Sequence, residues 1–328
     1  MKTLTSPIRR GCLAAAALMM MAPGAWAQAA WPAAKPISVT VGLQAGTGSD
    51  VAVRNIAEKV GPALGQQWVV SSLPGAAGLL AAQHGAKAAP DGYTLVALSG
   101  AAVTTLPHLQ KGPNPAKDLV PVAMIVSFPS VISVHGKVPA QNIREFLELA
   151  RKNPGKYTYA SGGSGSVQHT AMESLKAMAG INLMHVPYKG MAQATTDLVG
   201  GQVDSAIQGV VAVIPFVKTG QVRPLAWTGS RRNPLFPDLP TLHEAGVTGY
   251  NFQSWTALFA PAGTPQEIIN RLNAEVRRAA AAPDLRERWT ANGMEALDMT
   301  PAQIAQLIRT ESEDMAKLVR DTGIKLDQ

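Results

Sequence analysis

The sequence predicts an α/β protein, because short apolar segments typical of strands alternate with segments whose apolar residues recur at helical spacing. Glycine- and serine-rich loops follow several of these predicted strands, as expected where strands lead into helices. Two late helices also carry clear capping signals. With 328 residues, the chain is long enough for two domains.

The first third of the chain alternates regularly. Val53, Ile56, Val60 and Leu64 lie on one face of a predicted helix that Gly65 ends, although Pro62 could kink it. The strands are predicted at residues 37–43, 68–70 and 93–98, and the helices at residues 51–64 and 79–88.

The rest of the chain continues this alternation. Thr264 and Thr300 each precede a proline, with Glu267 or Gln303 three residues after the threonine, so both are expected to cap helices. The further strands are predicted at residues 156–160, 182–186, 206–208 and 223–228, and the helices at residues 143–150 and 169–179.

Residues 1–27 are typical of a cleavable secretory signal peptide. Lys2, Arg9 and Arg10 precede an apolar run that is too short for a permanent membrane span, and Ala25-Trp26-Ala27 offers a cleavage site. We therefore expect a mature protein in the periplasm of a Gram-negative cell. Cys12, the only cysteine, lies inside this segment, so we expect neither a disulfide nor a lipid anchor.

The charge balance argues against nucleic acid as a partner. Loss of the three positive charges in residues 1–27 lowers the formal net charge from +7 to +4. The remaining basic doublets are scattered and aromatic residues are few, unlike a nucleic-acid-binding stripe. We expect a monomer without a cofactor.

The run from Tyr159 to His169 is the strongest candidate for a binding site. Its unbroken glycine and serine stretch, residues 161–166, follows a predicted strand and opens a predicted helix. Backbone N–H groups, hydroxyls and the partial positive charge of a helix N-terminus can together bind an anion. The stretch is longer than a tight turn needs, so ligand contact is favoured. The candidates are Ser161, Gly162, Gly165, Ser166 and His169.

Three other loops follow predicted strands. The first is Ser99 to Ala101, and the second is Val186 to Gly190. In the second loop, Tyr188 is a better candidate than Lys189, which is the only cation in the four loops. In Gln44 to Asp50, Ser49 or Asp50 could cap a helix, and a purely structural turn is favoured for this loop alone. The candidates in these loops are Gln44, Gly46, Thr47, Gly48, Ser49, Asp50, Ser99 and Tyr188.

Sequence signatures of enzymes are missing. The run from Gly46 to Val51 lacks the last glycine of a dinucleotide-binding fingerprint, and Ser164 lacks a nucleophile-elbow setting. The six histidines show no metal-binding spacing. We therefore assign no catalytic residue and no metal ligand, and do not expect an enzyme.

Taken together, the ordered motifs of this chain resemble the Bug receptors, the periplasmic solute-binding proteins of tripartite tricarboxylate transporters. The likeness covers nearly all of the chain after the signal peptide. The motifs are Gly46 to Arg54, Pro74 to Gly78, Pro90 to Leu95, Tyr159 to His169, Val186 to Gly190, Gly200 to Asp204, Pro237 to Thr241, Glu244 to Gly246, Trp255 and Pro261 to Pro265.

The resemblance implies a two-lobed type II periplasmic binding protein fold, with a central sheet flanked by helices in each lobe. Lobe 1 would comprise residues 28–124 and 226–328, and lobe 2 residues 125–225, with crossings near Met124 to Phe128 and Leu225 to Trp227. The lobes would close on a small carboxylate-bearing ligand, for delivery to integral membrane transporter subunits or to a sensor. The segment from Tyr188 to Ala192, which includes the candidates Gly190 and Ala192, would line the cleft between the lobes.

Three departures from the family pattern concern the ligand more than the fold. Ala45-Gly46-Thr47 replaces the usual Pro-Gly-Gly, Ser71-Ser72 replaces Glu-Asn, and Ala77 replaces a glycine. The hydroxyl of Thr47 suggests a slightly different ligand head group. The alternatives are a secreted hydrolase or isomerase on a similar scaffold, and a structural periplasmic module.

Overall fold

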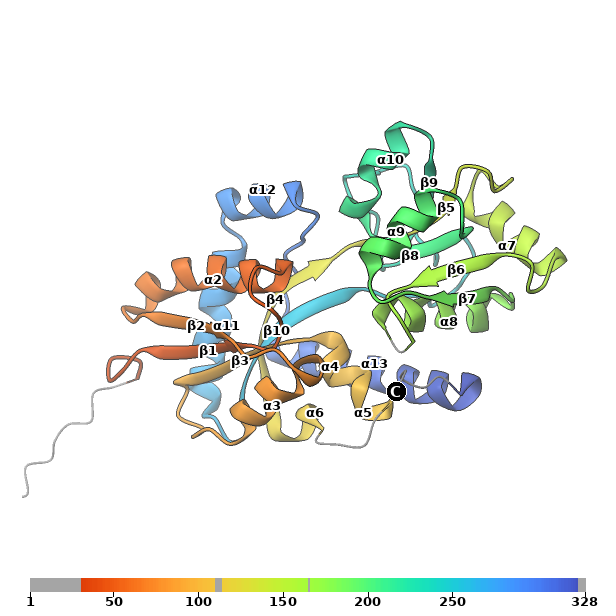
Figure 1. The fold of residues 1–328 in the computed structure, drawn as a ribbon. Coiled ribbons are helices and arrows are strands. Elements are labelled where there is room, and N and C mark those ends of the chain that lie inside the picture. The colour runs from red at the N-terminus through yellow and green to blue at the C-terminus, as the bar shows by residue number, and fades with distance from the viewer. Residues whose placement is uncertain (1–30, 110–113, 165, 324–328) are drawn as a thin grey trace, which may run out of the picture.

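Two five-stranded sheets, each covered by helices, form the two lobes of the molecule (Figure 1). The computed structural model describes residues 31–109, 114–164 and 166–323. The α/β class and the two-lobed arrangement are therefore confirmed. The predicted signal peptide, residues 1–27, lies outside the described residues.

The first sheet has the order β2-β1-β3-β10-β4. Its first three strands are parallel, whereas β10 runs antiparallel to both β3 and β4. The strands are β1 Ile37–Val41, β2 Trp68–Ser72, β3 Thr94–Ser99, β4 Leu119–Phe128 and β10 Ser254–Pro261. The α-helices are α2 Gly48–Leu64, α3 Leu79–Ala86, α4 Gly100–Thr104, α5 Leu106–Leu109, α6 Pro115–Asp118, α11 Gln266–Ala280, α12 Pro283–Ala291 and α13 Pro301–Thr322.

The second sheet has the order β7-β6-β8-β5-β9. Strand β6 pairs parallel with β7 and β8, and β5 pairs antiparallel with β8 and β9. The strands are β5 Ser130–His135, β6 Thr158–Ser161, β7 Met184–Pro187, β8 Ser205–Gly209 and β9 Val222–Trp227. The α-helices are α7 Ile143–Lys152, α8 Val167–Ala179, α9 Met191–Val199 and α10 Ile214–Lys218.

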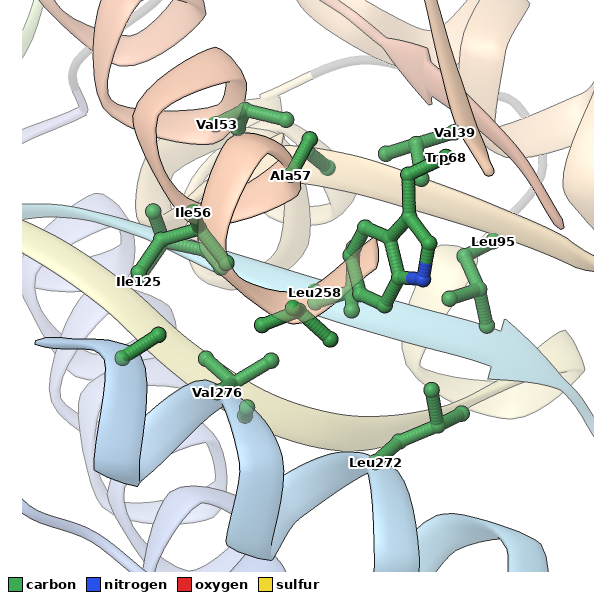
Figure 2. Packing of buried hydrophobic residues seen from close by; sticks show 14 of the residues in the cluster. Val39, Val53, Ile56, Ala57, Trp68, Leu95, Ile125, Leu258, Leu272 and Val276 are labelled. Atoms are coloured by element: carbon green, nitrogen blue, oxygen red, sulfur yellow. The ribbon is translucent and has the colours of Figure 1, made fainter. Parts of the chain in front are cut away.

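The core of the first lobe forms where α2 and α11 pack on the sheet (Figure 2). Ile56, on the predicted apolar face of α2, is fully buried in the same cluster as Val39 and Leu95. Pro62 lies inside the last turn of α2, and Gly65 ends the helix in the left-handed conformation. The expected apolar face and stop signal of this helix are confirmed.

Two capping predictions are wrong. Helix α2 begins at Gly48, and its cap is Thr47, whose Oγ1 accepts the N–H of Asp50. Ser49 and Asp50 do not cap it, because their side chains bond elsewhere. Helix α11 has Pro265 at its N-cap position, without a side-chain cap, and Thr264 lies one residue earlier, where its hydroxyl donates to the carbonyl of Pro261 at the end of β10. The capping box of Thr300 on α13 is confirmed.

The chain crosses between the sheets at Pro129, between β4 and β5, and returns between β9 and β10. Leu242, Ala245 and Tyr250 of the return segment are buried in the core of the second lobe. The lobe boundaries at residues 124 and 226 stay a prediction. We propose that the second boundary lies near Gln253, because the preceding segment packs with the second lobe.

We expect Ile56→Ala to lower the free energy of unfolding of the first lobe by about 2–5 kcal/mol, through lost apolar contact and the cavity left behind. The control is Val51→Ala on the same helix, where the side chain is 39% exposed. Urea unfolding followed by circular dichroism measures both. Equal losses in the two variants would contradict the assigned orientation of α2.

Candidate ligand-binding site

Asp50 holds the loop after β1 together from inside. Its carboxylate accepts the Gly46 N–H at 3.0 Å, two nitrogens of Arg54 at 3.0 and 3.1 Å, and the Ser72 hydroxyl at 3.1 Å. Burial raises the pKa of Asp50, but the hydrogen bonds from Arg54, Gly46 and Ser72 outweigh it, so the pKa lies below the usual range. Asp50 thus stays ionised and shapes the loop.

The loops after β1 and β3 both rest on β10. Ser49 is buried, with its Oγ 2.8 Å from Oγ1 of Thr256, and Thr256 is paired with Ser99 across the sheet. A Cβ at Gly100 would lie 2.6 Å from the Trp255 ring, so only glycine allows this approach. The structure therefore brings these two loops of the first lobe side by side.

The outer part of the first loop faces solvent. Gln44, Gly46 and Gly48 are exposed and Thr47 is partly buried, with its hydroxyl donating to the Gln44 carbonyl at 2.8 Å. A Cβ at Gly48 would lie 2.9 Å from the Phe128 ring, so this loop borders the first crossing between the sheets. Ser99 caps α4.

In the second lobe, the Ser161 hydroxyl points inward. Ser161 is completely buried, and its Oγ lies 2.7 Å from Nε2 of His185 and accepts the Gly163 N–H at 3.1 Å. Ser166 caps α8 by accepting the His169 N–H at 3.3 Å. Gly165 lies outside the described residues.

His169 belongs to a buried ring stack. It is 7% exposed, and its ring lies 4.1 Å from that of His185 at an interplanar angle of 5°. The Tyr159 ring is stacked with both, 4.8 Å from that of His185 and 6.3 Å from that of His169. The ring of His169 therefore packs behind the glycine- and serine-rich loop.

The last candidate loop lies against the second-lobe loop. The Tyr188 N–H donates to the Ser161 carbonyl at 3.1 Å, and the Tyr188 hydroxyl donates to Asp197 at 2.8 Å. Burial, together with the bond to Asp197, raises the pKa of Tyr188 to about 12. Gly190 is partly buried and Ala192 is exposed at the start of α9.

Gln208, near the carboxyl end of β8, was not predicted as a site residue. It is 2% exposed, and its Oε1 accepts the Thr195 hydroxyl at 2.7 Å. Its Nε2 is buried without a hydrogen-bond partner among the described residues. A buried amide donor without a hydrogen bond lowers the stability of the fold, so binding of a ligand that offers a hydrogen-bond acceptor here is favoured. Its hydrogen-bond partner Thr195 lies on α9, thirteen residues earlier, so this contact leaves no local pattern in the sequence.

A cavity of about 330 Å³ lies between the two lobes. Gly100 and Ala101 line it from the first lobe, and Val167, at the start of α8, lines it from the second. The starts of α4 and α8 thus face a common space. None of the described residues that were predicted to bind a ligand lines this cavity, in either lobe.

Glu311 of α13 also lines the cavity and was not predicted. It accepts the Trp255 indole N–H at 3.0 Å and the Thr104 hydroxyl at 3.4 Å. Burial raises the pKa of Glu311 to about 7, against the effect of these two hydrogen bonds and with a contribution from Asp314. Sequence reasoning missed this cluster because Thr104 and Glu311 are 207 residues apart.

Within the described ranges, no cluster of three or more histidine, cysteine or acidic side chains could hold a metal ion. None of the described helices is both long and apolar enough to cross a bilayer.

Comparison with known proteins agrees with this geometry. The family model described as "Tripartite tricarboxylate transporter family receptor", TctC, matches residues 52–324. The chain belongs to this family. The family resemblance proposed from the sequence motifs is therefore confirmed, and this TctC-family protein is a member of a family of periplasmic solute-binding receptors.

Similar proteins span nearly the whole chain. A UPF0065 protein from the tcbD-tcbE intergenic region of Pseudomonas sp. (strain P51) is 36% identical over 98% of this chain and 96% of its own length. Rpa4515 of R. palustris, solved with adipate, is 32% identical with a TM-score of 0.71, covering 90% of this chain and 99% of its own. MatC (Rpa3494) of Rhodopseudomonas palustris, solved with bound malate, is 32% identical with a TM-score of 0.67, covering 88% of this chain and 100% of its own.

The stability that Glu311 contributes should depend on pH. Because its folded-state pKa of about 7 exceeds the ordinary value of 4.5, this contribution is complete below pH 4.5 and is lost as the pH rises through 7. We expect the melting temperature of the wild type to fall more between pH 5 and pH 8 than that of Glu311→Gln.

The control is Glu313→Gln, an exposed position on the same helix. It should keep the pH dependence of the wild type. Parallel pH profiles for the wild type and Glu311→Gln would contradict the assignment.

Proposed function

We propose that this receptor binds a small dicarboxylate between its lobes and delivers it to tripartite tricarboxylate-type transporter subunits or to a sensor. The observation that supports this most is the shared cavity lined by Gly100, Ala101 and Val167, which belong to the starts of helices in opposite lobes. The proposed binding residues are those predicted from the sequence, with Asp50, Ser49 and Ser161 acting from behind the loops. Two of them, Ser99 and Ser166, directly precede the lining residues Gly100 and Val167.

Backbone N–H groups are the main donors available for an anion. The first N–H groups of a helix have no acceptor within the helix, which leaves those of Gly48, Val167 and Gln168 at the starts of α2 and α8. The nearby Arg54 already pairs with Asp50. A carboxylate would therefore be bound by dipoles and hydroxyls, and Gln208 could supply a further donor.

Closure follows from binding at both lobes. A ligand with two carboxylates contacts donors of both lobes only when these approach each other, so its extra affinity for the closed state shifts the population toward closure. The dicarboxylate class is supported by the adipate and malate found in similar structures.

The periplasmic location is proposed together with cleavage of residues 1–27, whose sequence is typical of a signal peptide. The family membership supports the same location.

One observation favours the hydrolase alternative. Ser161 Oγ and His185 Nε2 lie 2.7 Å apart, as in a nucleophile paired with its general base. However, Ser161 is completely buried, and its hydroxyl oxygen also accepts the Gly163 N–H. A substrate cannot reach this oxygen without rearrangement of the loop, so we rank ligand binding above hydrolysis.

A thermal-shift screen over small mono- and dicarboxylates, adipate and malate included, tests the function. We expect at least one dicarboxylate to raise the melting temperature, because a hundredfold excess over Kd stabilises the folded state by about 2.7 kcal/mol. Monocarboxylates of equal length should give smaller shifts. A screen without any shift, or turnover of a carboxylate ester that Ser161→Ala abolishes, would contradict the proposal.

Ser166→Ala should weaken binding of a dicarboxylate that is active in this screen by about tenfold, since it removes a hydroxyl and loosens the start of α8. Isothermal titration calorimetry measures this. The matched control is Thr300→Ala, which removes the cap of α13 and should cost a similar stability of about 1 kcal/mol. Equal affinities of the two variants would remove Ser166 from the site.

A further inference from the structure

The second-lobe loop is connected to a buried group of ionisable side chains. The contact begins at Ser161, the last residue of β6, whose Oγ lies 2.7 Å from Nε2 of His185 on β7. The His185 ring is in turn stacked on the rings of His169 and Tyr159, with centroids 4.1 and 4.8 Å away, and the rings of His169 and Tyr159 lie 6.3 Å from each other. Neither the sequence motifs nor the proposed binding contacts use His185.

The Ser161 hydroxyl has a choice of two acceptors. Its single proton can go to His185 Nε2 at 2.7 Å or to the Gly163 carbonyl oxygen at 3.2 Å. When Nε2 carries no proton, the hydroxyl donates to it. When Nε2 is protonated, the ring donates to Ser161 Oγ, and the hydroxyl proton is available to the Gly163 carbonyl.

Two charged side chains in contact with this stack pair with each other. Glu173 accepts the Tyr159 hydroxyl at 2.5 Å and pairs with Lys176 at the same distance. Lys176 also lies 5.4 Å from the centre of the Tyr159 ring. With Glu173 and Lys176 paired, a proton gained by the histidine pair adds a net positive charge behind the loop.

The two imidazoles cannot easily carry charge together. At 4.1 Å between ring centroids, positive charges on both rings would repel each other, which disfavours the state in which both are protonated. An unperturbed imidazole gains its proton near pH 6.5, within the range in which secreted proteins work.

We propose that His185 is a positioning residue for the loop that follows β6, and that its protonation changes the hydrogen bonding of Ser161 and thereby of Gly163. This inference goes beyond the binding contacts proposed above and concerns the regulation of the same site.

The consequence for ligand binding rests on the proposed function. A positive charge behind the loop attracts a carboxylate at its outer side, and by linkage a bound carboxylate favours protonation of the histidine pair. Binding of a dicarboxylate that stays fully ionised is therefore tighter at pH 6 than at pH 8.

The coupling within the protein can be measured without a ligand. The test follows histidine ring resonances and the Gly163 amide resonance by NMR in the full chain, between pH 5 and pH 8.5. We expect the His185 ring to titrate and the Gly163 amide shift to follow with the same midpoint. In Ser161→Ala, His185 should still titrate, but the Gly163 shift should no longer follow it.

His185→Gln should abolish the pH dependence of the Gly163 shift. The matched control is His243→Gln, at a distant turn where His243 Nδ1 accepts the Gly249 N–H at 3.0 Å. This control should leave the coupling unchanged. A constant Gly163 shift while His185 titrates, a His185 ring that does not titrate over this range, or unchanged coupling in Ser161→Ala would overturn the proposal.

Calorimetry with malate tests the effect on affinity. The wild type should bind malate about three- to tenfold more tightly at pH 6 than at pH 8, and His185→Gln should bind it equally at both. Equal wild-type affinities would overturn the regulatory part of the inference. If malate does not bind at either pH and the screen above finds no other acid, the carboxylate function fails, whereas the NMR titration still decides the role of His185.

Discussion

Strand β10 is the element on which the arrangement of the first lobe depends. It follows all the strands of the second sheet in the sequence, and it pairs antiparallel with β3 and β4 of the first sheet. Thr256 bonds Ser49 of the loop after β1, and Trp255 packs on Gly100 of the loop after β3. Both candidate loops of this lobe are therefore supported by a strand from a distant part of the sequence. Through Glu311, the same Trp255 also bonds to α13. The geometry of the site is thus a product of the tertiary fold.

This dependence explains how far the fold could be predicted. Helices with local start and stop signals were found from the sequence, as Gly65 and Thr300 show. The patterns did not identify β4, β5 or β10 as strands. Their residues form short apolar runs that periodicity alone cannot distinguish from buried helix segments, and their pairing is long-range and antiparallel. Likewise, Thr264 had every local feature of a cap, but α11 begins one residue later than expected, with Pro265 at its N-cap position, and the Thr264 hydroxyl donates to the Pro261 carbonyl.

The same distinction applies to the candidate site. The loops could be predicted, because glycine and serine between a predicted strand and a predicted helix indicate a turn that can bind an anion. The directions of their side chains could not. Ser161 and Asp50 were expected to face a ligand, and their polar atoms instead bond to His185 and Arg54. An Asp with an Arg four residues later is a recognisable helical pair, so the second contact left a sequence signal. The contact between Ser161 and His185 joins two strands, and it left no signal in the sequence.

These inward contacts have a physical advantage for a receptor that must release its ligand. Two cations near the loops are already paired, Arg54 with Asp50 and Lys176 with Glu173, so they need not lose a full hydration shell when the lobes close. A carboxylate then meets backbone dipoles whose orientation is fixed beforehand by the groups behind them. Each lobe supplies such donors on its own side. A ligand with one carboxylate can be satisfied by one lobe and gains little from closure, whereas a ligand with two gains contacts at the second lobe only in the closed state. Under the proposed function, the division of donors between the lobes would therefore select for the number and spacing of negative charges, with backbone groups as the main means of recognition.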